Sequence, residues 1–442
     1  MWKKICTTVL LMFLVSIAVS AFPVETVEPA EMVYTERSSM GSLSAVAEDF
    51  AWSLDENGVL TISGHGDMPY EINGQDYYDR HLVTMPWGFF SNKITSVIIN
   101  DGITSIAPSA FNGCAALTDI TIPNSVTTIG DDAFYACSSL KKIVLPDGLR
   151  TIGNSAFAGC TALEDISFPD SIVKIGRYVF GEDKGGNFTV PWYTTNYVAC
   201  TDEILYTGRI AYRYKFKDGA DRSEVSIKFK PGTKGIAPCL FMVPYAKISL
   251  YIPDTIEYIA ENAFRSPNGD PVCHVYITDL AAWCNMDFGE NDDCYLFDMS
   301  SFHASFLFRS SATQSSAKLY LNGEAVTHLV IPDGVTRIPN GAFANLSQLT
   351  DVTMPDSVTE IGDVAFYGCT NLENITFSKN ISKIGCEAFT KTAWYKNQPD
   401  GMLYINNIAY HYIGTMPENT TLGIRPGTTG ISQCFASNEG IN

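Results

Sequence analysis

Three consecutive 23-residue blocks of this chain align beneath one another without gaps. They are LTDITIPNSVTTIGDDAFYACSS (117–139), LKKIVLPDGLRTIGNSAFAGCTA (140–162) and LEDISFPDSIVKIGRYVFGEDKG (163–185). The same pattern precedes them at 94–116 and returns at 251–267 and through 326–394. A fixed period over so many copies is typical of a repeat architecture, in which each unit is one supersecondary element.

The apolar side chains of one block cannot be covered by that block alone. Ile120 and Ile122 share one face of a short strand, and Phe134 belongs to a second inward-facing set. Pro123 ends the strand, and Gly130 permits a tight turn before a short helical or 3-10 segment. Stacked blocks would share one continuous core with ladders of parallel strands. We therefore predict a β-rich, right-handed repeat solenoid of roughly ten coils.

Segments outside the blocks predict additional parts of the fold. Asn57-Gly58 stands between two alternating stretches and indicates a β-hairpin, and two Trp-Tyr segments, beginning at Pro191 and Ala393, resemble each other. The expected boundaries are 1–21 for a signal peptide, 22–49 for a flexible linker, 50–93 for an N-terminal β cap, 94–190, 224–267 and 326–392 for repeats, 191–223 and 393–417 for β-hairpin insertions, 268–325 for a Cys-containing insertion, and 418–442 for a final incomplete coil.

The N-terminal residues have the layout of a secretory signal. Lys3 and Lys4 precede an apolar run from Val9 to Val19, and small residues follow, including Ala21. The run is shorter than the roughly 18 apolar residues of a spanning helix. We therefore expect an exported chain that is secreted or located at the cell surface, with no membrane-spanning segment after signal cleavage.

The formal net charge of −19 argues against a nucleic-acid partner, because phosphate binding needs clustered lysine and arginine. Such a negative charge is typical of an exported protein whose molecules stay in solution because they repel one another. Binding of calcium or of a basic partner is the alternative.

The pattern L-x-x-I-x-I-P-x-S-V-x-x-I-G-x-x-A-F-x-x-C at 117–137 resembles the repeat of the BspA-like (Treponema pallidum type) leucine-rich-repeat surface proteins. The W-S-L-D-x-x-G-x-L-T-I-S-G-x-G-x-M-P segment at 52–69 is similar to their N-terminal part. The resemblance implies a leucine-rich-repeat solenoid and a role like that of adhesins and other surface binders. One departure from the general leucine-rich consensus is proline soon after the strand, as at Pro123 and Pro146, where other classes use an asparagine ladder.

Cysteine recurs at one position of the repeat, at Cys114, Cys137, Cys160 and Cys369. Side chains stacked on successive coils point the same way, which is poor disulfide geometry, so we predict a ladder of buried free thiols. The remaining group to consider is Cys273, Cys284 and Cys294, whose spacing contains no C-x-x-C zinc motif. One disulfide among these three is the better hypothesis for an exported chain.

No motif in the chain predicts catalysis or a cofactor. Asp287, Glu290, Asp292 and Asp293 lack the ligand spacing of a calcium loop and are interpreted as a solvated acidic loop. The six histidines, His328 among them, lie in no hydrolase signature. We therefore predict a protein that is not an enzyme and that binds neither a cofactor nor a metal.

Outward strand positions of successive coils form parallel rows that define a candidate binding face. Its residues are Thr118, Asp119, Thr121, Lys141, Lys142, Glu164, Asp165, Thr350, Asp351 and Thr353. Threonine in such rows can reflect strand preference alone, whereas exposed rows on a rigid scaffold also suit recognition. Five further aromatics are expected to pack against neighbouring coils, with a ligand contact as the alternative: Trp192, Tyr193, Tyr197, Trp394 and Tyr395.

Together these patterns predict a secreted or cell-surface, non-catalytic binding protein. It would be adhesin-like and would present a leucine-rich-repeat face to an extracellular protein or glycan. The alternative is an accessory or spacer module of a larger secreted hydrolase, whose catalytic domain these 442 residues do not contain.

Overall fold

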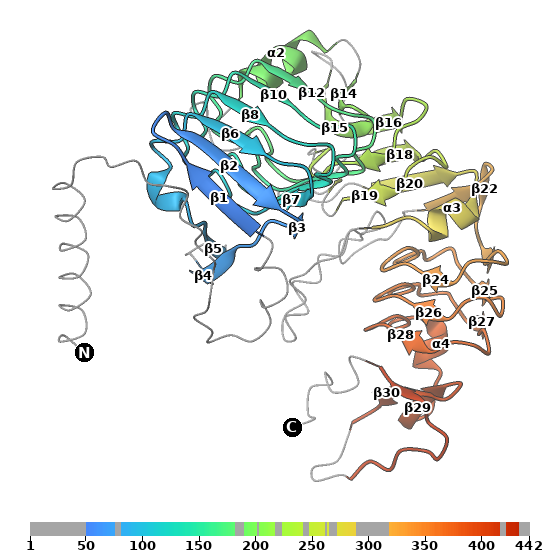
Figure 1. Ribbon diagram of the computed structural model, residues 1–442. Coiled ribbons are helices and arrows are strands. Elements are labelled where there is room, and N and C mark those ends of the chain that lie inside the picture. Colours follow the sequence, from blue (N-terminus) through green and yellow to red (C-terminus); the bar gives the residue numbers. More distant parts are fainter. Residues whose placement is uncertain are drawn as a thin grey trace.

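The computed structural model describes residues 50–75, 81–181, 190–200, 203–216, 223–241, 247–260, 263–264, 272–288, 318–415 and 421–432. The predicted signal peptide and linker lie outside these residues, as does the end of the predicted final coil. The fold within them is a β-solenoid of about 12 turns (Figure 1), which confirms the predicted fold class.

A first wall of the solenoid consists of short parallel strands. They are β6 (Ser96–Ile99), β8 (Asp119–Thr121), β10 (Lys142–Val144), β12 (Asp165–Ser167), β16 (Glu224–Lys228), β18 (Lys247–Tyr251), β20 (Val272–Ile277), β21 (Lys318–Leu321), β23 (His328–Val330), β25 (Asp351–Thr353) and β27 (Asn374–Thr376). Val97 pairs with Ile120, and Ile143 pairs with Ile166, each 23 residues further along the chain. One sequence repeat is therefore one turn of the solenoid.

A second wall contains two-residue and four-residue strands of the same coils. They are β7 (Ile103–Ile106), β9 (Thr128–Ile129), β11 (Thr151–Ile152), β13 (Lys174–Ile175), β17 (Gly235–Ile236), β19 (Tyr258–Ile259), β24 (Arg337–Ile338), β26 (Glu360–Ile361), β28 (Lys383–Ile384) and β31 (Gly430–Ile431). Ile129 stacks between Ile106 and Ile152 in this ladder, and all three are buried. The repeated isoleucine thus forms the second inward set expected from the sequence.

A third wall holds the expected short turns, which remain single 3-10-type turns and do not extend into helices. The N–H groups of Tyr135 and Cys137 donate to carbonyls three residues earlier in their own coil. The N–H groups of Phe134 and Ala136, which alternate with them along the chain, donate to carbonyls of the next coil at 2.9 and 2.8 Å. Ala136 accordingly adopts a φ of 59°. These N–H groups are used in hydrogen bonds between coils and are therefore not available to extend the turn into a continuous helix.

Phenylalanines of the third wall form a stacked spine in the core. Phe134 lies between Phe111 and Phe157, with ring centroids 5.3 and 5.5 Å apart, and Trp87 begins this stack 6.1 Å from Phe111. A second spine of Phe343, Phe366 and Phe389 has centroid separations of 5.4 and 5.5 Å. The two spines define two regular arrays within one chain.

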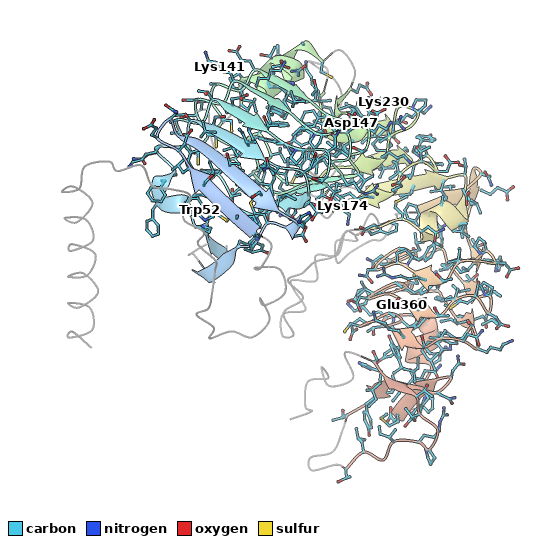
Figure 2. All side chains as sticks on the ribbon, viewed as in Figure 1. Trp52, Lys141, Asp147, Lys174, Lys230 and Glu360 are labelled. Carbon is cyan, nitrogen blue, oxygen red and sulfur yellow. The ribbon has the colours of Figure 1, made fainter. Side chains whose placement is uncertain are left out.

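The expected N-terminal β cap covers the first coil. β1 (Phe50–Leu54) and β2 (Val59–Gly64) form an antiparallel hairpin whose turn includes Asn57-Gly58, and β2 then pairs in parallel with β6. Trp52 lies on β1 (Figure 2). Its ring centroid is 6.0 Å from that of Trp87, with the two rings in an edge-to-face arrangement. The cap also contains β3 (Gly66–Asp67), β4 (Glu71–Gln75), β5 (His81–Thr84) and the 3-10 helix η2 (Gly88–Phe90).

The two Trp-Tyr segments form helices, which the sequence interpretation missed. They are α2 (Pro191–Ala199) and α4 (Ala393–Lys396), and each precedes one of the expected hairpins, β14 (Ile204–Thr207) with β15 (Ile210–Tyr214) and β29 (Gly401–Ile405) with β30 (Ile408–Ile413). Pro191 suits a first helical position, and the Thr392 side chain caps α4 by accepting from the Tyr395 N–H. β15 and β30 pair in parallel with β17 and β31, so each hairpin replaces part of a coil.

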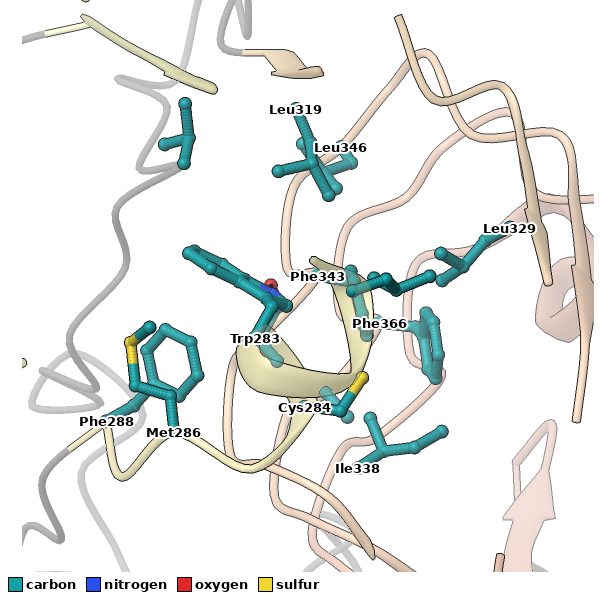
Figure 3. Close-up of a cluster of buried hydrophobic side chains, with 14 of the residues drawn as sticks. Trp283, Cys284, Met286, Phe288, Leu319, Leu329, Ile338, Phe343, Leu346 and Phe366 are labelled. Carbon is teal, nitrogen blue, oxygen red and sulfur yellow. Dashed lines mark hydrogen bonds between the residues drawn. The ribbon is translucent and has the colours of Figure 1, made fainter. Parts of the chain in front are cut away.

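Within the stretch expected as a Cys-containing insertion, 268–325, the described residues 272–288 and 318–325 belong to the solenoid. β20 lies between β18 and β21 in one parallel sheet, which β22 (Glu324–Ala325) closes. The helix α3 (Leu280–Cys284) buries Trp283, whose indole N–H donates to the Ala342 carbonyl at 3.2 Å. Figure 3 shows Trp283 and Cys284 beside Phe343 and Phe366 of the second array. Because this coil does not keep the 23-residue spacing, the repeat alignment did not identify its inward residues.

The second array begins at this irregular region. Trp283 starts it much as Trp87 starts the first, since the Trp87 indole N–H donates to the equivalent carbonyl, that of Ala110, at 2.7 Å. In Figure 1 the second array runs at an angle to the first, and α3 and β22 lie where the direction changes. Among the described residues, no helix has the length and hydrophobicity required to span a bilayer.

We expect Phe134→Ala to lower the free energy of unfolding by about 3–5 kcal/mol, because it removes a buried ring from the middle of the spine. Val144→Ala on the neighbouring coil is the control, since the Val144 side chain is 62% exposed and should change the value by no more than about 0.5 kcal/mol. Urea unfolding followed by circular dichroism measures both. Equal losses for the two variants would contradict the proposed role of the spine.

Candidate binding surface

The strands of the first wall alternate between core and solvent. In β8, Asp119 and Thr121 are exposed while Ile120 between them is 7% exposed, and β10 and β12 repeat this arrangement. The candidate residues Thr118, Lys141 and Glu164 just before these strands are also exposed. The outward rows predicted from the sequence therefore exist as accessible side chains.

The candidate residues of the first array interact with one another weakly. The Lys142 ammonium lies 2.6 Å from an Asp165 carboxylate oxygen, and both side chains are more than half exposed. Such exposed pairs contribute roughly 0–1 kcal/mol. The hydroxyl of Thr118 donates to the Thr95 carbonyl at 3.1 Å, so it is partly used by the backbone.

In the second array, the candidate residue Asp351 is the centre of a hydrogen-bonded row across three strands. One carboxylate oxygen lies 2.6 Å from His328 Nδ1 and accepts from the Thr350 hydroxyl at 2.6 Å, and the other accepts from the Asn374 amide at 2.8 Å. The hydrogen bonds from Thr350 and Asn374, followed by that with His328, lower the pKa of Asp351. Thr353 on the same strand is exposed.

The two groups of candidate residues lie on different sheets. Residues of β8, β10 and β12 belong to the first array, whereas β25 lies in the sheet formed by β23, β25 and β27. The separate sheet β16-β18-β20-β21-β22 stands between them in the chain. The structure thus places the ten candidate residues on two surfaces and not on a single face.

The Trp-Tyr segments pack against the ends of the phenylalanine spines. The Trp192 ring centroid lies 4.9 Å from that of Phe180, and the Trp394 centroid lies 5.6 Å from that of Phe389. Tyr193 is buried, and Tyr197 stacks on it at 5.5 Å. This confirms the packing role expected for these aromatics.

A row of outward tyrosines was not recognised from the sequence. The register pairs Tyr251 with Tyr276 and Tyr276 with Tyr320 on the central sheet. Their rings stack with centroids 4.7 and 4.6 Å apart and interplanar angles of 12° and 9°. The related strings SLYI, HVYI and KLYL were a usable signal, but two of them fell within the stretch interpreted as an insertion.

A ladder of asparagine and aspartate side chains also escaped the sequence interpretation. The Asp131 carboxylate accepts from the Asn154 N–H at 2.6 Å, and the Asn154 side chain accepts from the Arg177 N–H at 2.7 Å. Asn340 and Asp363 do the same in the second array. These residues come two positions after the isoleucine that ends each short second-wall strand, following Ile-Gly or, at Asn340, Ile-Pro. The sequence interpretation had considered only the end of the first-wall strand, where it noted proline.

A buried polar group lies beside the last hairpin. His411 Nε2 is 3.9 Å from a Glu387 carboxylate oxygen, the Tyr395 hydroxyl hydrogen-bonds His411 Nδ1, and burial lowers the pKa of His411. His411 and Glu387 are only 6% and 8% exposed, so a substrate in solvent does not reach them. Nowhere in the described ranges do three His, Cys, Asp or Glu side chains gather in a way that could hold a metal ion.

The family of the BspA type leucine rich repeat region matches residues 87–197 and 313–417, with six copies of the repeat. The chain belongs to the BspA-type leucine-rich-repeat proteins. This confirms the resemblance drawn from residues 117–137.

Several solved structures are similar to this BspA-type chain. A leucine-rich repeat protein from Eubacterium ventriosum is 21% identical, with 86% of this chain and 97% of that chain covered and a TM-score of 0.29. A leucine-rich cell surface protein from Faecalibacterium prausnitzii is 21% identical over 76% of each chain, with a TM-score of 0.22. The leucine-rich repeat protein of T. pallidum is 18% identical over 74% of this chain and 89% of that chain, with a TM-score of 0.20. No curated protein matches the chain significantly.

The repeated cysteines of this BspA-type array are buried free thiols, as predicted. Cys114, Cys137, Cys160 and Cys369 are at most 1% exposed and unpaired. Cys160 and Cys369 donate to backbone carbonyls at 3.1 and 3.0 Å. Burial raises the pKa of Cys114 and of Cys369 to about 12.

The other cysteine and acidic predictions are only partly covered by the described residues. Cys284 is free and buried, whereas the side chains of Cys273 and Cys294 lie outside the described residues. Cys386 is disulfide-bonded. Of the predicted acidic loop, Asp287 is described and forms an ion pair with Lys174.

We expect iodoacetamide at pH 8 to label Cys114 and Cys369 only after unfolding. In the folded repeat protein the raised pKa keeps these thiols protonated at pH 8 and burial excludes the reagent, whereas an unfolded cysteine has a pKa of about 8.5 and ionises readily. Peptide mapping by mass spectrometry, with and without urea, measures each site. The half-buried Cys200 serves as the internal comparison, and labelling of Cys114 as fast as Cys200 without urea would contradict the expectation.

We expect Asp351→Asn to make stability less sensitive to acid. A carboxyl whose pKa is lowered on folding stabilises the folded state above its unfolded pKa, and this contribution is lost as the pH falls through the folded value. The urea midpoint should therefore drop less between pH 7 and pH 3 in the variant than in the wild type. Asp119→Asn is the matched control, because Asp119 occupies the same strand position and has no side-chain partner among the described residues. An equal drop in all three proteins would refute this role of Asp351.

Proposed function

We propose that this BspA-type chain is a secreted or cell-surface, non-catalytic and adhesin-like binding protein that presents its outward strand rows to an extracellular protein or glycan. The observation that carries the proposal is the alternation in β8, β10 and β12, where every second side chain is buried and its neighbours are exposed. Residues that the core does not use are free to contact a partner.

The scaffold supports recognition because it holds these side chains in regular rows. Adjacent strands of a ladder lie about 4.8 Å apart, and the buried stack beneath them resists rearrangement. Lys142 and Asp165 are side by side on adjacent strands and largely exposed. Charged residues of both signs on one surface can discriminate between partners by electrostatic complementarity.

Export of the chain is supported by its first residues. Lys3 and Lys4 before the apolar run have the order of a cleavable signal. The non-catalytic part of the proposal is supported by the sequence, whose six histidines lie in no hydrolase signature.

The test compares a face variant with a matched control. The face variant carries Lys141→Ala, Lys142→Ala, Glu164→Ala and Asp165→Ala, and the control carries Asp147→Ala and Arg150→Ala in an exposed turn. Both sets leave the net charge unchanged, and Figure 2 shows Lys141 and Asp147 at well-separated places. Each purified protein is presented to a panel of extracellular-matrix proteins and to a glycan array.

We expect the wild type and the control to bind at least one ligand equally, and the face variant to bind it about 10-fold more weakly or worse. Thermal unfolding should be similar for all three proteins, because the substituted side chains are exposed. If the wild type binds nothing above the face variant, the proposal fails.

A further inference from the structure

The central sheet presents a second surface, distinct from the candidate face. The pairing of β16, β18, β20 and β21 places Lys228, Tyr251, Tyr276 and Tyr320 side by side in one outward row. Valine, isoleucine and leucine at the alternate positions of these strands are buried, as at Ile227. The row therefore stands on a packed core.

The tyrosine rings form a rigid, partly open stack. Their centroid separations of 4.7 and 4.6 Å with nearly parallel planes describe stacked rings. Tyr251 is 39% exposed, and Tyr276 and Tyr320 are partly exposed. Tyrosine offers a large contact area at a low cost in side-chain entropy, which is why it is frequent in protein-binding surfaces.

Three lysines lie on the same outward face as the stack: Lys228 is in its row, Lys318 is two residues before Tyr320, and Lys247 is four residues before Tyr251 and in register with Glu224. Lys228, Lys247 and Lys318 point outward from this sheet and form no ion pair with any residue that the structure describes. Several lysines on the strands and turns of the two arrays do form ion pairs, for example Lys142 with Asp165 and Lys383 with Glu360. On a chain of net charge −19, unpaired lysines on the same face as an aromatic row complement an anionic partner.

His274 lies in register with Lys318 on the outward face of this sheet. It lies beside the tyrosine row, 6.2 Å from the Tyr320 ring centroid, and its Nδ1 atom is buried without a hydrogen-bond partner within the described chain. Burial, followed by the charges of Lys318 and Lys247, lowers the pKa of His274. The outward residue Glu224 is the carboxylate that opposes this effect.

One edge of the sheet is closed to an added strand. β21 and β22 form a tight hairpin through Asn322 and Gly323, whose φ values of 52° and 87° match a type I′ turn. A partner at the β21 end therefore contacts side chains on the face, and not the backbone of an open edge. From Lys228 to Tyr320 the row crosses three strand spacings, about 14 Å, which an extended peptide of about four or five residues covers.

We propose that the outward face of β16, β18, β20 and β21 binds an acidic, extended segment of a protein partner. The tyrosine stack supplies the contact area, and Lys228, Lys247 and Lys318 supply charges for aspartate or glutamate side chains. The inference rests on the proposed function of the chain as a binding protein and adds a second surface with a stated chemistry.

The test selects peptides from a display library of random dodecapeptides on the full chain. Two variants separate the contributions: Tyr251→Ser with Tyr276→Ser and Tyr320→Ser, and Lys228→Glu with Lys247→Glu and Lys318→Glu. The lysine variant keeps the tyrosine stack, so it remains informative if the tyrosine variant unfolds at a lower temperature. Lys93→Glu with Lys379→Glu and Lys396→Glu makes the same charge change at exposed positions outside both proposed surfaces and serves as the control. Peptides recovered on the wild type are synthesised, and their dissociation constants are measured on all four proteins and at two salt concentrations.

We expect the wild-type pool to be richer in aspartate and glutamate than the pool from the lysine variant. Its peptides should bind both central-sheet variants about 10-fold more weakly or worse, bind the control unchanged, and weaken with salt. The inference is overturned if acidic peptides are enriched equally on the lysine variant, or if no peptide distinguishes the wild type from both variants. Glycan-array binding that depends on the tyrosines, without acidic peptides, would also overturn it in favour of a glycan. Because the candidate face is tested by other variants, failure here leaves the proposed function standing.

Discussion

Each coil of this protein depends on its neighbours to cover its apolar side chains. Phe134 illustrates the constraint, because its ring is fully buried only between Phe111 and Phe157 of the adjacent coils. Ile129 has the same relation to the isoleucines above and below it. Stability therefore comes from interfaces between successive units, and the backbone ladders follow the stacking of the core.

The same constraint separates folding from recognition. Side chains that point inward must fit the core in size and shape, as the repeated isoleucine and phenylalanine do. Side chains at the alternate strand positions point to solvent and are not needed for packing. These outward positions vary from Asp119 to Lys142 to Asp165 without disturbing the register. A family built this way can change its surface while it keeps one core.

Irregular coils divide that surface into separate regions. The central sheet of the first wall ends at the antiparallel strand β22, and Trp283 of α3 starts a new phenylalanine spine beyond it. As a result, Asp119 and Asp351 occupy equivalent strand positions on different sheets. The unpaired lysines and stacked tyrosines lie on the sheet between them, where the chain departs most from its repeat.

The sequence by itself determined the solenoid, its inward residues, the free thiols and the exposed rows of Asp119 and Lys142. These depend on a 23-residue period, and side chains one period apart must stack once the coils do. Only the tertiary structure decided which rows share a sheet, that the Trp-Tyr segments are helical, and that Tyr276 meets Tyr320 across 44 residues of chain. The reason is that these contacts join coils of unequal length, and pairing across an interruption is set by how the chain packs around it rather than by any regular spacing.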